Sequence, residues 1–117
     1  MEPGGDSNRT LTQLRRGALP HCVLAVLADG ERYGFELIGV LAEARGLAIS
    51  EGTIYPLLSR LRREGLVETS WQESDSGPPR RYYRLTADGE RALANFREDW
   101  QGYRDTVDEL LGTGGRR

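Results

Sequence analysis

The spacing of apolar residues in the first quarter of the chain predicts a long helix. Apolar positions recur every three or four residues over 11–28, and Asp29-Gly30 then ends the pattern. Gly17 and Pro20 weaken the first half of this pattern, because glycine costs backbone entropy and proline removes a helical hydrogen bond. We therefore expect this helix either to be kinked or to begin near Leu19.

Two further helices follow, separated by a short apolar stretch. Residues 35–42 predict a short amphipathic helix, and residues 47–49 predict a fragment of strand. Ser50 is a typical N-cap for a third helix over 51–64, which Gly65 ends. At 100° per residue, the apolar residues of the third helix fall on one narrow stripe that must face the core. They are Ile54, Leu57, Leu58 and Leu61.

The opposite side of the third helix carries residues that contribute little to packing. An exposed glycine and tyrosine gain nothing from burial there, and Pro56 removes a backbone hydrogen bond inside the helix. Such a face is typical of a helix that contacts a partner. The residues that project outward are Gly52, Tyr55, Pro56, Ser59, Arg60 and Arg63.

Two runs rich in β-branched and aromatic residues, 66–73 and 80–86, predict a β-hairpin. The residues between them, 74–79, read Ser-Asp-Ser-Gly-Pro-Pro and predict a six-residue tip. Side chains alternate between the two faces of a strand, so the returning strand presents basic and aromatic residues on both. One face carries Arg80, Tyr82 and Arg84, and the other carries Arg81, Tyr83 and Leu85.

The last helix has the clearest periodicity in the chain. Thr86 is placed to cap a helix over 87–111, which is about 37 Å long at 1.5 Å per residue. Its apolar residues are separated alternately by three and four positions, as in a coiled coil, and predict pairing with a helix of another chain. This heptad row is Leu93, Phe96, Trp100, Tyr103, Val107 and Leu110.

Composition and charge narrow the class of protein. A chain of 117 residues with 38% apolar and 29% charged residues is long enough for one compact domain. Its net charge of −2 argues against a nucleic-acid binder, but the charge is unevenly distributed. Residues 76–86 contain three arginines and no acid, whereas 67–75 contain three acids and no base. A local basic surface is therefore compatible with the acidic total.

The few residues suited to catalysis or metal binding are poorly arranged for either. His21 and Cys22 are neighbours on a helix, so their side chains point about 100° apart and are expected to pack in the core. We find no catalytic constellation and expect no enzyme activity, no metal and no cofactor. A single cysteine and a polar, acidic start of the chain predict a cytoplasmic protein. The longest apolar run, 22–28, is too short to cross a membrane.

The order of elements is that of a mostly α fold with a small β-hairpin, the winged helix-turn-helix, followed by one long C-terminal helix. In that fold the third helix enters the major groove of DNA and the hairpin lies along the neighbouring backbone. The alternative is a winged-helix module that uses the same face to bind a protein.

Three motifs resemble the PadR-like family of transcriptional regulators. They are Tyr-Gly-Phe-Glu-Leu at 33–37, Gly-Thr-Ile-Tyr-Pro-Leu-Leu at 52–58, and Pro-Arg-Arg-Tyr-Tyr-Arg-Leu-Thr at 79–86. The resemblance covers roughly residues 17–100. Phe35 stands where the family more often has tyrosine, at a position expected to pack. The single helix after Thr86 resembles the short subfamily.

The resemblance implies a cytoplasmic homodimer, commonly a repressor, that binds a palindromic operator and leaves it when a small molecule arrives. Family dimers form largely through the C-terminal helix packing on the partner's N-terminal helix. We thus expect a flexible tail over 1–10, a DNA-binding domain over 11–86, a dimerisation helix over 87–111 and a flexible tail over 112–117. Leu11 and Leu14, together with the heptad row, are the expected dimer interface.

The expected DNA contacts lie on the third helix and the hairpin. Gly52 and Thr53 near the helix N-terminus are placed for phosphate, and Tyr55, Ser59 and Arg60 for bases or sugars. The alternative is that these residues cap the helix and pack locally, and that the hairpin arginines form an ordinary solvated face. The full set is Ser50, Glu51, Gly52, Thr53, Tyr55, Pro56, Ser59, Arg60, Arg63, Arg80 and Arg81.

Phe96 and Trp100 have two interpretations. Both fit a dimer core, but a tryptophan at an a position packs poorly against its symmetry mate in a two-stranded coil. The second interpretation is an open slot in which a planar aromatic effector stacks between two Trp100 rings.

Overall fold

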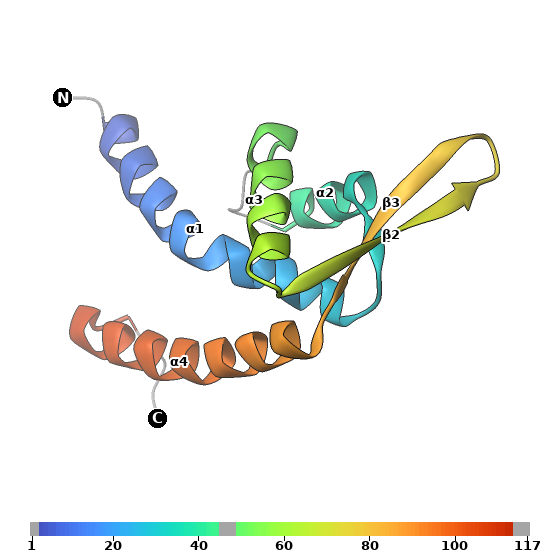
Figure 1. Ribbon diagram of the computed structural model, residues 1–117. Helices are drawn as coiled ribbons and strands as arrows, with labels where there is room; N and C mark the ends of the chain where they lie inside the picture. Colours follow the sequence, from blue (N-terminus) through green and yellow to red (C-terminus); the bar gives the residue numbers. More distant parts are fainter. Residues whose placement is uncertain (1–2, 45–48, 114–117) are drawn as a thin grey trace.

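The computed structural model describes residues 3–44 and 49–113 and has the expected fold class (Figure 1). The described residues form four helices and a small three-stranded antiparallel sheet with strand order β1-β3-β2, whose β2–β3 hairpin extends away from the helices. The elements are α1 (Pro3–Ala28), β1 (Arg32–Tyr33), α2 (Gly34–Ala42), α3 (Glu51–Arg63), β2 (Val67–Ser74), β3 (Gly77–Leu85) and α4 (Ala87–Leu111). The prediction of a winged helix followed by one long C-terminal helix is confirmed.

Helix α1 is longer than the sequence predicted. It runs without interruption from Pro3 and contains Pro20, so the expected tail over residues 1–10 is helical from Pro3 onward. The helix does not begin near Leu19. The lost hydrogen bond at Pro20 is offset by burial, because Leu19, Pro20 and Val23 are all buried against the rest of the chain. At the other end of the chain, α4 ends at Gly112, whose left-handed φ of 71° suits a residue without Cβ.

The third strand lies where the sequence showed no signal. Residues 47 and 48 of the predicted strand fragment lie outside the described residues, and Ile49 is not in a strand. The strand that joins the hairpin is β1, whose Arg32 pairs with Tyr83 and whose Tyr33 pairs with Tyr82. It directly precedes α2 and so fixes the start of that helix to the sheet.

The β2–β3 hairpin, called the wing below, turns more tightly than predicted. Ser74 pairs with Gly77, so two residues form the tip instead of six, and Pro78 and Pro79 belong to β3. The prolines are tolerated because β1 pairs only with the inner end of β3, which leaves the outer part of β3 without a neighbour on that side. The Ser74 hydroxyl lies 2.9 Å from the carbonyl oxygens of both Gly77 and Pro78.

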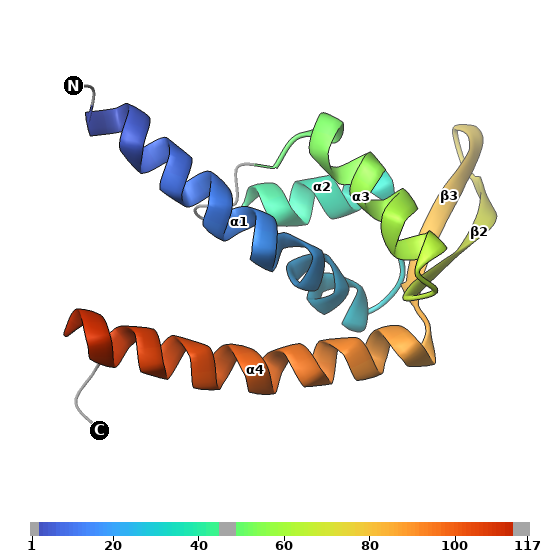
Figure 2. The same ribbon diagram turned by 60° about the vertical axis from the view of Figure 1, so that its left-hand side comes forward.

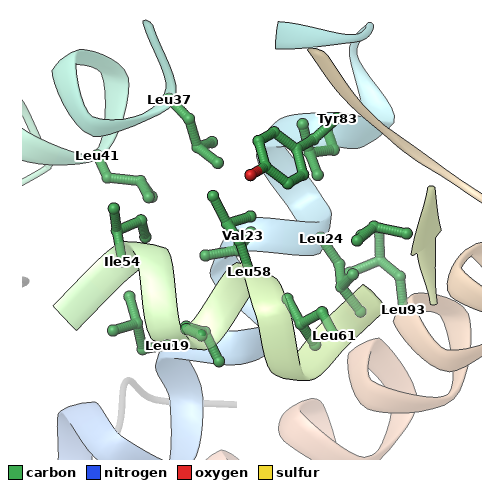
Figure 3. Close-up of a cluster of buried hydrophobic side chains, with 13 residues drawn as sticks. Leu19, Val23, Leu24, Leu37, Leu41, Ile54, Leu58, Leu61, Tyr83 and Leu93 are labelled. Carbon is green, nitrogen blue, oxygen red and sulfur yellow. The ribbon is translucent and has the colours of Figure 1, made fainter. Parts of the chain in front are cut away.

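The core lies where α1, α2, α3, the root of the wing and α4 meet (Figure 3). The predicted stripe of α3 is buried in full, and Leu93 of α4 and Tyr83 of β3 close the core from two further sides. The remaining large core side chains are Leu19, Val23, Leu24, Leu27, Leu37, Leu41 and Val67.

A short joint attaches α4 to the turn after α3. Thr86 caps α4 as predicted, because its hydroxyl accepts a hydrogen bond from the Gly89 N–H at 3.0 Å. The same hydroxyl donates to the Gly65 carbonyl at 2.7 Å, and the Thr86 N–H donates to the Leu66 carbonyl at 3.1 Å. A Cβ added at Gly89 would lie 2.1 Å from the Leu66 carbonyl oxygen, so only glycine allows this approach.

Candidate nucleic-acid interface

The outward face of α3 is open along its whole length. Every α3 residue predicted to contact DNA is exposed, as is the N-cap Ser50. In both views α4 lies on one side of the molecule, while α3 and the outer part of the wing lie on the other (Figures 1 and 2). The fold therefore presents α3 and the wing away from the helix expected to form the dimer.

The first turn of α3 exposes two hydroxyl groups. The Ser50 carbonyl accepts the N–H groups of Thr53 and Ile54 at 3.0 and 2.9 Å, which confirms Ser50 as the N-cap. Its side chain makes no capping hydrogen bond and instead lies 3.3 Å from the Thr53 hydroxyl. These polar groups, with the positive end of the helix dipole, suit contact with an anion.

Tyr55 packs against the start of α2, a partner that the sequence did not specify. A Cβ added at Gly34 would lie 2.5 Å from Cε1 and 2.8 Å from the hydroxyl oxygen of Tyr55, so the ring rests on the start of α2 where no side chain intervenes. The rest of the ring is exposed. Burial raises the pKa of Tyr55, with the Glu51 charge and Tyr83 acting in the same direction. The phenol thus remains a hydrogen-bond donor at neutral pH.

The two wing arginines predicted to contact DNA are each held by an aromatic ring. The Arg80 guanidinium lies 4.5 Å from the centre of the Tyr33 ring, and that of Arg81 lies 5.7 Å from the centre of the Trp71 ring. Arg80 is exposed, whereas Arg81 is half-buried with its Nε lacking a hydrogen-bond partner among the described residues. Cation–π contact orients both groups without neutralising their charge.

Among the described residues, neither Arg80 nor Arg81 forms an ion pair with an acidic side chain. Glu68 pairs with Arg84, at 2.9 Å between carboxylate and Nε, and not with Arg80 or Arg81. Gln72 donates to Glu31 at 2.7 Å. On α3, Arg60 lies 3.5 Å from Glu64 in a half-exposed i,i+4 pair that water screens. Both guanidinium groups therefore remain available to an anion, although Glu73 and Asp75 also lie in the outer part of the wing.

Trp71 and Tyr33 were not among the predicted site residues. Trp71 is 67% exposed and stands directly opposite Arg81 in the hairpin register. That register needs both the two-residue turn and the bulge between Gln72 and Ser74, so the predicted six-residue tip concealed the pair. Phe35, expected to pack, is also 67% exposed, because α2 buries its other side through Gly34, Leu37 and Leu41.

The predicted dimer residues differ in exposure: one is buried, two are half-buried and five are exposed. Leu93 is only 3% exposed within a single chain, so its place in the dimer interface was predicted wrongly: it belongs to the chain's own core. Phe96 is half-buried and stacks on His21 of α1, with ring centres 4.0 Å apart, a contact the sequence did not suggest. Val107 is half-buried as well. The others are exposed in one chain: Leu11, Leu14, Trp100, Tyr103 and Leu110.

The described residues contain no group of three or more His, Cys, Asp and Glu side chains placed to hold a metal ion. Burial raises the pKa of the Cys22 thiol, and burial followed by the charge of Arg60 lowers the pKa of His21. Within the described ranges, none of the helices combines the length and apolar character needed to cross a membrane.

The fold and this exposed surface define a winged helix-turn-helix transcriptional regulator. The model of the transcriptional regulator PadR-like family matches residues 23–95, and the chain belongs to that family. PadR-like regulators bind DNA, and the resemblance seen in the three sequence motifs is confirmed.

Individual relatives agree over nearly the whole chain. The transcriptional regulator Rv3488 of Mycobacterium tuberculosis is 35% identical over 102 residues, which are 87% of this chain and 91% of that protein. The crystal structure of a PadR family transcriptional regulator from Eggerthella lenta has a TM-score of 0.82 at 36% identity, covering 95% of this chain and 96% of that one. A PadR-like regulator from Bacillus cereus has a TM-score of 0.78 at 38% identity, covering 88% and 99%.

Proposed function

We propose that the protein is a cytoplasmic, homodimeric repressor that binds a palindromic operator and is released by a small aromatic effector. The observation that carries DNA recognition is the outward face of α3, on which every predicted contact residue is exposed. In this proposal α3 enters the major groove, and the wing follows the neighbouring backbone.

Each part of the interface has a distinct role. The hydroxyls of Ser50 and Thr53 and the free N–H groups of the first turn of α3 bind phosphate. Further along the helix, Tyr55 and Arg60 reach base edges or sugars, where Arg60 offers a planar pair of donors to a guanine edge. Arg80, held over Tyr33, contacts the backbone and carries no sequence information.

The exposed apolar residues at the far ends of α1 and α4 support the homodimer. The two helix ends extend beyond the core and diverge (Figure 1), and both carry large apolar side chains in contact with water. Full burial of such a side chain contributes about 1.5–3 kcal/mol, which a second copy of the same chain would supply. A two-fold pair would then place two α3 helices on half-sites about one helical turn apart.

Trp100 supports an aromatic effector. Phe96 and Trp100 lie 6.1 Å apart between ring centres at 19° between planes, and Tyr103 follows at 6.4 Å. With His21 stacked on Phe96, these rings form a continuous row that ends on an exposed surface. A planar ligand stacked on Trp100 at the two-fold axis would alter how the two chains meet.

DNA recognition is tested by fluorescence anisotropy with the DNA upstream of its own gene and a scrambled duplex, across a salt series. We expect tighter binding to the upstream DNA and a linear fall of log affinity with log salt. Arg60→Gln should reduce the preference for the upstream DNA, and Arg80→Gln should weaken both duplexes alike. Arg91→Gln, on the α4 side, is the control. Equal binding to the two duplexes, or binding that does not depend on salt, contradicts the proposal. Absence of DNA binding even at low salt favours the alternative, a module that binds a protein, and such a module would tolerate substitutions at Tyr55 and Arg60.

The effector is tested by quenching of tryptophan fluorescence with acridine orange. The chain has two tryptophans, so the measurement is made in Trp71→Phe, in which Trp100 alone reports. We expect saturable quenching in this background and loss of dye binding, read from the dye's own fluorescence, in Trp100→Ala. An unchanged dye affinity in Trp100→Ala would dismiss the slot.

A further inference from the structure

A basic surface between α1 and α3 adjoins the predicted DNA face and shares residues of α3 with it. A hollow of about 530 Å³ separates the two helices, which stand next to each other in both ribbon views (Figures 1 and 2). We call it the α1–α3 hollow. Helix α1 lines it with Thr12, Arg15, Arg16, Leu19 and Pro20, and α3 lines it with Thr53, Pro56, Leu57, Arg60 and Arg63.

The lining of this hollow combines an apolar floor with a cationic rim. Leu19, Pro20 and Leu57 are buried, so they form a floor that belongs to the core. Four of the lining residues are arginines and none is acidic. Guanidinium groups pair bidentately with carboxylate, sulfonate and phosphate oxygens, and the volume is in the range of small-molecule sites.

A second hollow in the molecule shows that this charge pattern is particular to the α1–α3 hollow. A space of about 480 Å³ at the base of the wing is lined by both signs of charge, with Glu31 and Glu90 beside Arg84 and Arg97. There Arg84 is already paired with Glu68. In the α1–α3 hollow, Arg60 pairs with Glu64, which lies outside the lining, and the lining residues themselves include no acid.

The α1–α3 hollow and the predicted dimer interface have no residue in common. The α1 residues of the hollow do not include Leu11 or Leu14, and no α4 residue lines it. The charge of Arg60 nevertheless extends to α1, where it contributes with burial to lowering the pKa of His21. The hollow is lined by residues of a single chain and is therefore present once in each chain.

We propose that the α1–α3 hollow binds an amphipathic organic anion, with its apolar or aromatic body on Leu19, Pro20 and Pro56 and its acidic group held by arginines of both helices. Four of the lining residues are also predicted DNA contacts: Thr53, Pro56, Arg60 and Arg63. An anion seated there would compete with DNA for these side chains, and this consequence rests on the proposed function. The binding itself does not.

The test uses 8-anilinonaphthalene-1-sulfonate, an aromatic sulfonate, titrated into the full chain without DNA. We expect saturable fluorescence enhancement with one dye per chain, retained in Trp100→Ala. Arg16 lies on α1, outside the predicted DNA contacts, so Arg16→Gln should weaken binding about tenfold, as expected for loss of one charge-assisted hydrogen bond. Arg97→Gln, in the second hollow, should leave dye affinity unchanged.

Two results would overturn the proposal. One is a stoichiometry of one dye per two chains that Trp100→Ala abolishes, which would place the dye on the two-fold axis. The other is dye affinity unchanged in Arg16→Gln while DNA affinity falls, which would make the hollow a phosphate contact. Because the titration contains no DNA, it remains decisive even if the protein fails to bind its upstream DNA. Where DNA does bind, the dye should weaken it in the wild type and much less in Arg16→Gln.

Discussion

The two ends of α4 carry the same kind of apolar residue in opposite environments. Leu93 near the start is buried with Leu24 and Leu61 (Figure 3), whereas Leu110 near the end is 81% exposed. Helix α1 shows the same division in reverse order along the chain, because Leu19 is buried and Leu14 is exposed. One half of each helix completes the fold of a single chain, and the other half presents apolar surface that a single chain leaves in water.

A regular heptad row therefore does not mark a single interface. The row runs from the core of the chain to a surface that is exposed in the single chain, without any change in spacing. Periodicity indicates which side of a helix is apolar, but burial shows which stretch of that side stabilises the single chain and which is left for the proposed dimer. The substitutions below separate these two contributions.

The largest effect is expected for Leu58→Ala in the core of the single chain. Leu58 is fully buried on α3, so its truncation should lower the free energy of unfolding by about 2–5 kcal/mol through lost burial and a cavity. Urea unfolding followed by circular dichroism measures this loss. The change relative to wild type should be the same at every protein concentration, and a loss below about 1 kcal/mol would mean the core is less complete than described.

The joint that attaches α4 to the turn after α3 is tested by a matched pair of glycines. Gly89→Ala places a Cβ 2.1 Å from the Leu66 carbonyl oxygen, and the forced shift should cost about 1–3 kcal/mol in thermal unfolding. Gly102→Ala, on the same helix with nothing within 4 Å, should be neutral or stabilising by up to about 1 kcal/mol. Equal effects of the two substitutions would contradict the close approach at Gly89.

The exposed half is tested by two neighbouring leucines. Leu110 belongs to the heptad row and Leu111 does not, although both are exposed. Leu110→Ser should raise the dimer dissociation constant about tenfold in sedimentation equilibrium, since burying one leucine is worth at least about 1.5 kcal/mol. Leu111→Ser should leave it unchanged. If both substitutions weaken the dimer equally, the row is not the interface.

The smallest effect concerns the His21–Phe96 contact, which joins the two helices at the boundary between the regions. Burial lowers the pKa of His21 in the folded chain, so the unfolded state binds a proton first as the pH falls. Stability should be full above the ordinary histidine pKa near 6.5 and decline as the pH falls through the lowered value. In His21→Phe, thermal unfolding should depend less steeply on pH between about 7 and 5. An equal slope in both proteins would remove His21 as the cause.

Local rules were sufficient where a residue's role depends on its own neighbours in the sequence. The α3 stripe, the Thr86 cap and the Gly65 termination follow from spacing and backbone conformation, and the structure has all three. The exposed residues of α3 were predicted by elimination, since they lie opposite that stripe. The two-residue strand β1 has no periodicity of its own and exists only because Tyr82 and Tyr83 pair with it.

Contacts between distant segments were beyond the reach of the sequence. Gly34 and Tyr55 both lie in the sequence motifs, but only the approach of α2 to α3 shows that the absence of a side chain at Gly34 makes room for the Tyr55 ring. Trp71 faces Arg81 because of a register that the proline-rich tip obscured. Pro20 reads as a helix breaker, and the tertiary burial around it decided otherwise.

The joint at Thr86 and Gly89 has a mechanical consequence in the proposed dimer. It fixes the direction of α4 relative to the turn that ends α3, through two hydrogen bonds of the Thr86 hydroxyl and the close approach of Gly89 to Leu66. Helix α4 then acts as a lever about 37 Å long, and a rotation of about 5° at one end displaces the other by about 3 Å, the length of a hydrogen bond. Small changes in how two such levers cross would be enough to move a recognition helix out of register with its half-site.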